Sequence, residues 1–349
     1  MRTPPLSAPA ARVAWPDVAR GLSVVLIVML HLWATHLVFW IGDERIMSVI
    51  STVLEWTTPL RVPLFFFISG YLASRSLTRP WRAAWRGRVL SVAYLYVLWV
   101  AIIAVFVWLD NLANDFSSVN PLTMLARNIG SPETHMWYLW ALVVLFVAVW
   151  ATKAVPAWIV IGVGALISVG APFLIDQPYR QVAAAVLFYA LGARLPAVGD
   201  WLASTRGVWI FLAGAALYTG SMLLGPTGPY GFADPLTSFI GVAATIAIIG
   251  VVANRPWMAL LRRVGRNTLP IFILNPLIFL LLNDVLRAMP GLAAWLGEHA
   301  VWGSLYAVGI VVATLAGSIC IKMAADRVGL RWLFEMPDRW ARVTSPGRV

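Results

Sequence analysis

Residues 17–33 read DVARGLSVVLIVMLHLW, and this stretch decides the fold. It belongs to an apolar segment of about the length that crosses a bilayer as a helix. Arg20 and His31 lie eleven positions apart within it. Because a helix turns about 100° per residue, the two side chains share one face and lie roughly 16 Å apart along the axis.

A shared face of this kind has two interpretations. Ionisable groups inside a bilayer are costly and usually face a protein interior or a wet cavity, which predicts a functional site with His31 as a general base. The structural alternative is that Arg20 snorkels to the interface and His31 hydrogen-bonds a neighbouring helix.

The composition excludes an ordinary soluble domain. Of the 349 residues, 60% are hydrophobic and 12% are charged, whereas roughly a quarter of a soluble domain is charged. A net charge of +11 could indicate a protein that binds nucleic acid. The arginines, however, cluster in short loops between apolar segments, as the positive-inside rule explains. We therefore expect an all-α polytopic membrane protein whose partner is the lipid bilayer, with no nucleic acid.

Ten apolar segments predict ten transmembrane helices, with both termini in the cytoplasm of a bacterial inner membrane. Under this topology most of the 26 basic residues lie on the inner side. The segments are 18–41, 48–75, 88–109, 136–153, 156–175, 179–196, 207–225, 234–252, 268–288 and 301–323.

The second segment combines helix breakers with buried charges. Pro59 and Pro63 predict a kink or break, and the stretch PLFFFISGYL from residue 63 places a small polar notch at Ser69-Gly70. Glu55 and Arg61 have two interpretations. They pair with each other across Pro59, or Glu55 orients a catalytic imidazole.

A third motif, HMWYLW, begins at His135 at the expected outer end of the fourth segment. It suits either an interfacial aromatic belt or a site that stacks on a sugar and supplies a second acid or base. Trp137 is about 200° around a helix from His135, so we expect it to pack against another helix or lipid. Tyr138 can share the face of His135.

In order and spacing, these motifs together resemble the acyltransferase-3 family of membrane-embedded acyltransferases over essentially the whole chain. Arg20 and His31 match its Arg-x10-His signature, and Ser69 lies in its Phe-Phe-x-x-Ser-Gly signature. His135 and Trp137 match a His-x-Trp-Phe-Leu stretch, with Tyr138 in place of Phe. One departure is that Phe272 and Asn275 stand where relatives commonly carry Tyr and His before a proline.

The resemblance implies transfer of an acyl group, often acetyl from acetyl-CoA, to a hydroxyl of a carbohydrate, glycolipid or small natural product. It implies acyl-CoA as co-substrate, with no permanently bound cofactor and no metal. The expected catalytic residues are His31, Arg20, His135 and Ser69. CoA phosphates are expected at Arg20, Arg82, Arg86 and Arg88, whose guanidinium groups suit phosphate. The acceptor is expected at His135, Tyr138, Glu55 and Asn275, and Ser69 and Asn275 are candidate oxyanion donors.

The expected organisation is a disordered cytoplasmic N-terminus (1–14), a transmembrane acyltransferase domain (15–325) and a cytoplasmic tail (326–349). A transporter or lipid flippase without acyl transfer is the alternative function, since buried charges on interrupted helices also form substrate paths. A structural or sensory subunit is the other alternative. A tunnel from the cytoplasmic arginines to His31 would favour the enzyme.

Overall fold

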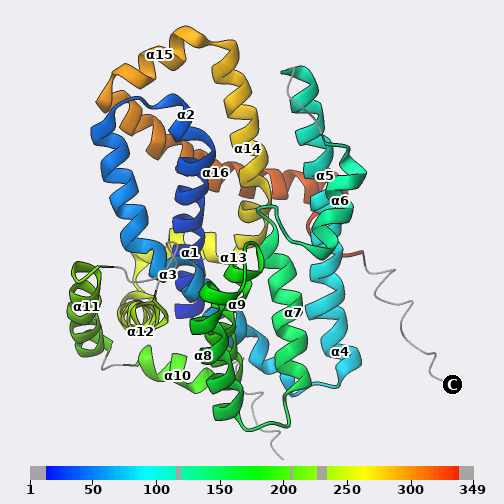
Figure 1. The fold of residues 1–349 in the computed structure, drawn as a ribbon, viewed down its shortest axis with the longest axis vertical. Coiled ribbons are helices and arrows are strands. Elements are labelled where there is room, and N and C mark those ends of the chain that lie inside the picture. Colours follow the sequence, from blue (N-terminus) through cyan, green and yellow to red (C-terminus); the bar gives the residue numbers. More distant parts are fainter. Residues whose placement is uncertain (1–12, 115–118, 205–206, 226–233, 338–349) are drawn as a thin grey trace, which may run out of the picture.

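The computed structural model describes residues 13–114, 119–204, 207–225 and 234–337, and all regular elements in these ranges are helical (Figure 1). The all-α prediction is therefore confirmed. The predicted N-terminal segment 1–14 lies almost wholly outside the described residues, as does the part of the tail after residue 337. The main helices are α1 (Trp15–Leu32), α3 (Glu44–Leu77), α5 (Ser91–Ala113), α7 (Trp137–Ala151), α8 (Ala157–Leu174), α9 (Tyr179–Arg194), α11 (Gly207–Leu223), α12 (Pro235–Val252), α14 (Thr268–Ala288) and α16 (Ala300–Arg327).

Each of the ten predicted segments overlaps one of these helices. The first also includes a π-helical turn, η1 (Trp33–Leu37), and α2 (Val38–Trp40). The third is preceded by α4 (Trp81–Trp85) and begins within a second π turn, η2 (Arg86–Leu90). Five spans are long and apolar enough to cross a membrane, namely 15–40, 81–113, α12, α14 and α16. The pair α9 and α10 (Pro196–Leu202), bent by 85°, adds a sixth if it counts as one span, while α7, α11 and residues 157–170 of α8 form shorter apolar helices.

The sequence prediction missed several short helices because none has the length of a span. They are α6 (Pro121–Gly130), α10, α13 (Ala259–Arg266) and α15 (Pro290–Glu298). The predicted break in the second segment is wrong, since α3 continues through Pro59 and Pro63 for 34 residues.

Helix α1 lies between α3 and α14, and α13 crosses it near its N-terminus (Figure 1). Both helices have a glycine at this crossing. A Cβ on Gly21 would lie 2.2 Å from the Leu261 carbonyl oxygen, and one on Gly265 would lie 1.7 Å from that of Asp17. The Arg266 Nε donates to Asp17 Oδ2 at 3.0 Å beside them. The crossing therefore fixes the helix that carries Arg20 and His31.

Helices α3 and α9 cross just as closely. A Cβ on Gly70 would lie 2.2 Å from the Tyr189 carbonyl oxygen, and one on Gly192 would lie 2.0 Å from that of Phe67. Small residues allow such close approach of helix backbones. The notch predicted at Ser69-Gly70 thus receives a helix, and this contact fixes the phenylalanines that precede it on α3.

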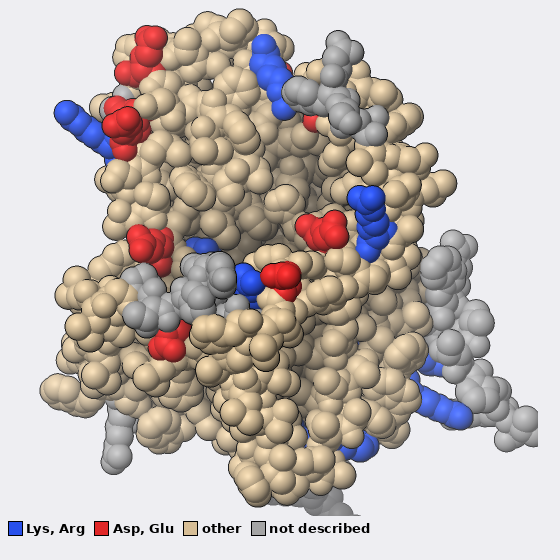
Figure 2. All heavy atoms as spheres, viewed as in Figure 1, with Lys and Arg blue, Asp and Glu red and all other residues tan. Residues whose placement is uncertain are grey.

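Most of the visible face of the molecule is uncharged, as expected for a protein surrounded by lipid (Figure 2). The face is hollowed near its centre, and several charged side chains lie around the hollow (Figure 2).

Candidate active site

His31 is held by an asparagine of α14. Its Nδ1 lies 2.9 Å from Asn275 Oδ1, and Asn275 is fully buried. An amide oxygen can only accept a hydrogen bond, so His31 Nδ1 carries the proton. The other ring nitrogen, Nε2, is then the basic one in the neutral imidazole.

The orientation of Asn275 follows from the proline after it. Pro276 has no backbone N–H, so the carbonyl of Phe272 lacks its helical donor. Asn275 Nδ2 supplies that donor at 2.8 Å, and it also approaches the Ile271 carbonyl at 3.2 Å. With the amide nitrogen facing two carbonyls, the amide oxygen must face His31. The backbone of α14 thereby selects the tautomer of the histidine.

Asn275 thus has the orienting role that one of the two sequence interpretations gives to Glu55. The Glu55 side chain is exposed, and it is absent from the residues that line the cavity beside His31. The expected pairing of Glu55 with Arg61 is also wrong, because Arg61 Nη1 donates to the Leu54 carbonyl at 2.8 Å. An amide can orient an imidazole as a carboxylate does, as the Cys-His-Asn form of the triad illustrates.

His135 lies against His31, with ring centroids 4.8 Å apart and ring planes at 86°. It stands in the turn before α7, which begins at Trp137. The residues of the first and third motifs therefore meet, although they are 104 positions apart in sequence.

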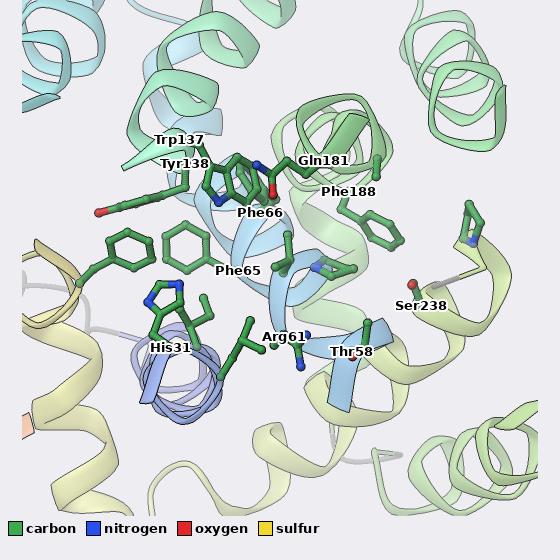
Figure 3. Close-up of a pocket in the computed structure, with 18 of the residues that line it drawn as sticks. His31, Thr58, Arg61, Phe65, Phe66, Trp137, Tyr138, Gln181, Phe188 and Ser238 are labelled. Atoms are coloured by element: carbon green, nitrogen blue, oxygen red, sulfur yellow. The ribbon is translucent and has the colours of Figure 1, made fainter. Parts of the chain in front are cut away.

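His31 opens on a cavity of about 350 Å³, here called the His31 cavity (Figure 3). Its polar lining is Thr58, Arg61, Gln177, Gln181 and Ser238, and its aromatic lining is Phe65, Phe66, Trp137, Tyr138, Phe188 and Phe272. The volume is at the lower end of the usual range for small-molecule sites.

The position of Trp137 differs in part from the expectation that it packs only against another helix or lipid. It does pack on another helix, with its ring 5.6 Å from that of Phe66, but it also lines the His31 cavity beside Tyr138. His135 precedes the helix, so the 100° step per helical residue does not relate its side chain to that of Trp137.

A second cavity of about 210 Å³, here called the Arg20 cavity, lies on the other side of Tyr138. Arg20 and Arg88 line it together with Ser69 and Thr268. Arg20 Nη2 donates to Thr268 Oγ1 at 2.5 Å. Since α14 contacts both Arg20 and His31, the two side chains share a face of α1, as the spacing predicted.

Three aromatic side chains, Phe65, Tyr138 and Phe272, line both cavities. The Tyr138 ring centroid lies 3.7 Å from that of Phe272 and 5.4 Å from that of Phe65. The two cavities therefore adjoin across an aromatic wall.

Other predicted site residues are placed differently. Arg88 donates to Ser76 Oγ at 3.1 Å and to the Leu72 carbonyl, whereas Arg82 and Arg86 line neither cavity. The predicted oxyanion donors are already engaged. Ser69 donates its hydroxyl to the Phe65 carbonyl at 2.8 Å, and both hydrogens of the Asn275 amide face carbonyls. This arrangement leaves neither group a hydrogen for an oxyanion.

Sequence reasoning overlooked Thr268 and the polar side chains near Arg61. The signal for Thr268 was its position, two helical turns before Asn275 on α14. Nothing in the sequence pattern indicated that Gln181 of α9 and Ser238 of α12 would line the cavity. Among the described residues, no group of three or more His, Cys, Asp or Glu side chains could hold a metal ion.

Comparisons with known proteins identify the family of this chain. Residues 13–323 match the acyltransferase-3 family, described as "Acyltransferase domain". The chain is similar to "Inner membrane protein YcfT" of Escherichia coli (strain K12), with 23% identity over 370 residues that cover 95% of this chain and 98% of the relative. No solved structure shows a significant match. Because the family match covers most of the chain, this membrane protein belongs to the acyltransferase-3 family.

Proposed function

We propose that this protein transfers an acyl group, acetyl from acetyl-CoA, to a hydroxyl of a carbohydrate, glycolipid or small natural product at a bacterial inner membrane. The observation that carries the proposal is the state of His31. Asn275 Oδ1 accepts a hydrogen bond from His31 Nδ1 at 2.9 Å, so a basic Nε2 is available where two adjoining cavities can hold two reactants.

In this proposal the His31 cavity holds the acceptor. His31 Nε2 removes the hydroxyl proton while the hydroxyl oxygen attacks the thioester carbonyl carbon. The tetrahedral intermediate then collapses, the carbon–sulfur bond breaks, and the proton on Nε2 passes to the departing CoA thiolate. The products are an ester and free CoA, and His31 returns to its starting state. Base assistance of this kind contributes about 10²–10⁴-fold.

The Arg20 cavity suits the donor. Arg20 and Arg88 bring guanidinium groups to one side of the aromatic wall, and such groups bind phosphate oxygens in a fork geometry. With both termini in the cytoplasm, the basic segment around Arg88 faces the compartment that contains acyl-CoA. Arg82 and Arg86 would then contact the CoA phosphates outside the cavity, on the path of approach.

His135 supports the base in this proposal. Its ring lies against His31, with ring centroids 4.8 Å apart, and it lines neither cavity, so it contacts the general base rather than the acceptor hydroxyl. Tyr138 belongs to the aromatic wall between the two cavities, so the thioester end of the donor must reach past this wall for the hydroxyl to attack its carbonyl carbon. Holding the two reactants in adjoining cavities lowers the entropic cost of bringing them together.

The test uses the full-length protein in lipid nanodiscs with acetyl-CoA and envelope extract as the source of acceptors. We expect release of CoA thiol and incorporation of labelled acetyl, both lost in His31→Gln, which keeps a side chain of similar reach without the base. His299→Gln is the matched control, because His299 is exposed at the start of α16 and lines neither cavity. Acetyl transfer at the wild-type rate by the His31 variant would refute the general-base role. Transport of a lipid or solute without thiol release would instead support the transporter alternative.

A further inference from the structure

Arg61 is a buried cation that the proposed chemistry does not use. It lies on α3 between Pro59 and Pro63, is 8% exposed and lines the His31 cavity (Figure 3). A guanidinium has five N–H donors. Its one hydrogen bond to a described residue runs from Nη1 to the Leu54 carbonyl at 2.8 Å.

No acidic side chain balances this charge within the described ranges. Arg61 forms no ion pair with an Asp or Glu there, and the lining of the His31 cavity contains none. The nearest acid along α3, Glu55, is exposed. A buried charge without a counter-charge is strongly unfavourable, so a site that retains one is suited to an anionic ligand.

The surroundings of Arg61 indicate where that anion lies relative to the reacting hydroxyl. In Figure 3, His31 is at the left of the cavity, Ser238 of α12 is at the right, and Arg61 lies between them. Thr58 and Gln181 add neutral polar groups to the same cavity. Such groups suit the hydroxyls of the ligand that carries the anion, in a space of about 350 Å³.

We propose that the acceptor is an anionic hydroxyl compound, bearing a carboxylate or a phosphate, and that Arg61 binds this anion while His31 faces the hydroxyl to be acylated. The inference rests on the proposed function, since it assigns the His31 cavity to the acceptor. It makes Arg61 a substrate-binding residue that selects charged over neutral acceptors.

The test compares three sugars that differ mainly at one carbon: D-glucose, D-glucuronate and D-glucose 6-phosphate. Equilibrium binding of each radiolabelled sugar is measured on the full-length protein in nanodiscs at fixed ionic strength. We expect at least one anionic sugar to bind about tenfold or more tightly than glucose, as charge-assisted hydrogen bonds permit. The preferred sugar distinguishes a carboxylate from a phosphate.

Arg61→Gln should abolish this preference, and Arg61→Lys should retain part of it, because lysine keeps the charge but not the fork. Arg45→Gln is the matched control, since Arg45 is exposed on the same helix. Equal binding of the three sugars by the wild type, or an anion preference that survives Arg61→Gln, would overturn the proposal.

Two further measurements separate this inference from the proposed function. Cleavage of acetyl-CoA by the wild type without acceptor, lost in His31→Gln, tests the proposed function alone, and an unchanged thermal unfolding temperature shows that Arg61→Gln is folded. A further arm compares succinyl-CoA with acetyl-CoA. If Arg61→Gln selectively lost the succinyl donor and kept the acceptor preference, Arg61 would bind a carboxylate of the acyl group, which contradicts the proposal.

Discussion

Two histidines of the first span each contact an asparagine of α14, yet their environments differ. His31 Nδ1 lies 2.9 Å from Asn275 Oδ1, and His36 Nδ1 lies 2.5 Å from Asn283 Oδ1. The second nitrogen of His36 meets the Tyr306 hydroxyl at 2.6 Å. His31 instead lines a cavity. The pairs are alike, but only His31 has a nitrogen that can reach a substrate.

The π-helical turn explains how both histidines face the same helix. Residues five positions apart on an α-helix point about 140° apart. The turn Trp33–Leu37 is π-helical, and its i to i+5 hydrogen bonding reduces that rotation. His36 is completely buried, and Trp40 Nε1 also donates to Asn283 Oδ1 at 2.8 Å. His36 therefore ties α1, α14 and α16 together, whereas His31 serves the cavity.

The largest expected effect separates these two roles directly. His31→Gln should lower acyl transfer by about 10²–10⁴-fold with little change in thermal stability. His36→Gln should do the reverse, since it disrupts buried hydrogen bonds worth about 1–3 kcal/mol and leaves the cavity intact. Transfer rates per folded molecule and thermal unfolding in detergent check both. Equal losses of activity at unchanged stability would show that His36 is also part of the reaction.

The asparagines sharpen the same comparison. Asn275→Ala removes the acceptor for His31 Nδ1 and the donor for the Phe272 carbonyl. We expect a fall in kcat of about tenfold to a hundredfold, as small losses of alignment produce. Asn283→Ala should lower stability and leave kcat within about threefold, because misalignment there does not reach the base. Steady-state kinetics on both variants decide this, and a larger loss of kcat from Asn283→Ala would contradict the assignment.

These histidine–asparagine pairs also show which features of the site can be predicted from the sequence. The helical period placed Arg20 and His31 on one face, and the Ser69-Gly70 notch marked a close helix crossing. The helical period does not predict that Asn275 orients His31, because the two residues are 244 positions apart in the sequence.

The failures have physical causes as well. Trp137 packs on another helix as expected, but its place in the cavity lining was not predicted, because the turn containing His135 is not the start of the helix. An orienting role for Glu55 is one of the two interpretations because a carboxylate is the common partner of a catalytic imidazole, and sequence alone does not reveal that its side chain is exposed. Burial and long-range contacts decide such questions, and both require the fold.

A substitution of Arg20 tests whether the Arg20 cavity binds the acyl-CoA donor and the His31 cavity binds the acceptor. Arg20→Lys keeps the charge but loses the planar fork and the bond to Thr268 as it stands. We expect the apparent KM for acyl-CoA to rise about tenfold, which is the loss of one hydrogen bond to a charged group, with a smaller change for the acceptor. Initial rates with each substrate varied in turn provide the measurement. An effect confined to the acceptor would exchange the assignments of the two cavities.

The smallest effect is expected at the wall between the cavities. Tyr138 is buried, and its ring packs on Phe65 and Phe272. Its hydroxyl points away from the His31 cavity in Figure 3 and makes no hydrogen bond with another described residue. Tyr138→Phe preserves the ring contacts, so kcat should stay within about threefold, which corresponds to less than 1 kcal/mol in the barrier.

Tyr138→Ala is the matched contrast, because it opens the wall between the two cavities and should increase hydrolysis of acyl-CoA relative to acyl transfer. The ratio of thiol release to acyl incorporation measures both variants. If Phe alone abolished transfer, the hydroxyl would be an oxyanion donor, the role that Ser69 and Asn275 leave vacant because their hydrogens are already donated.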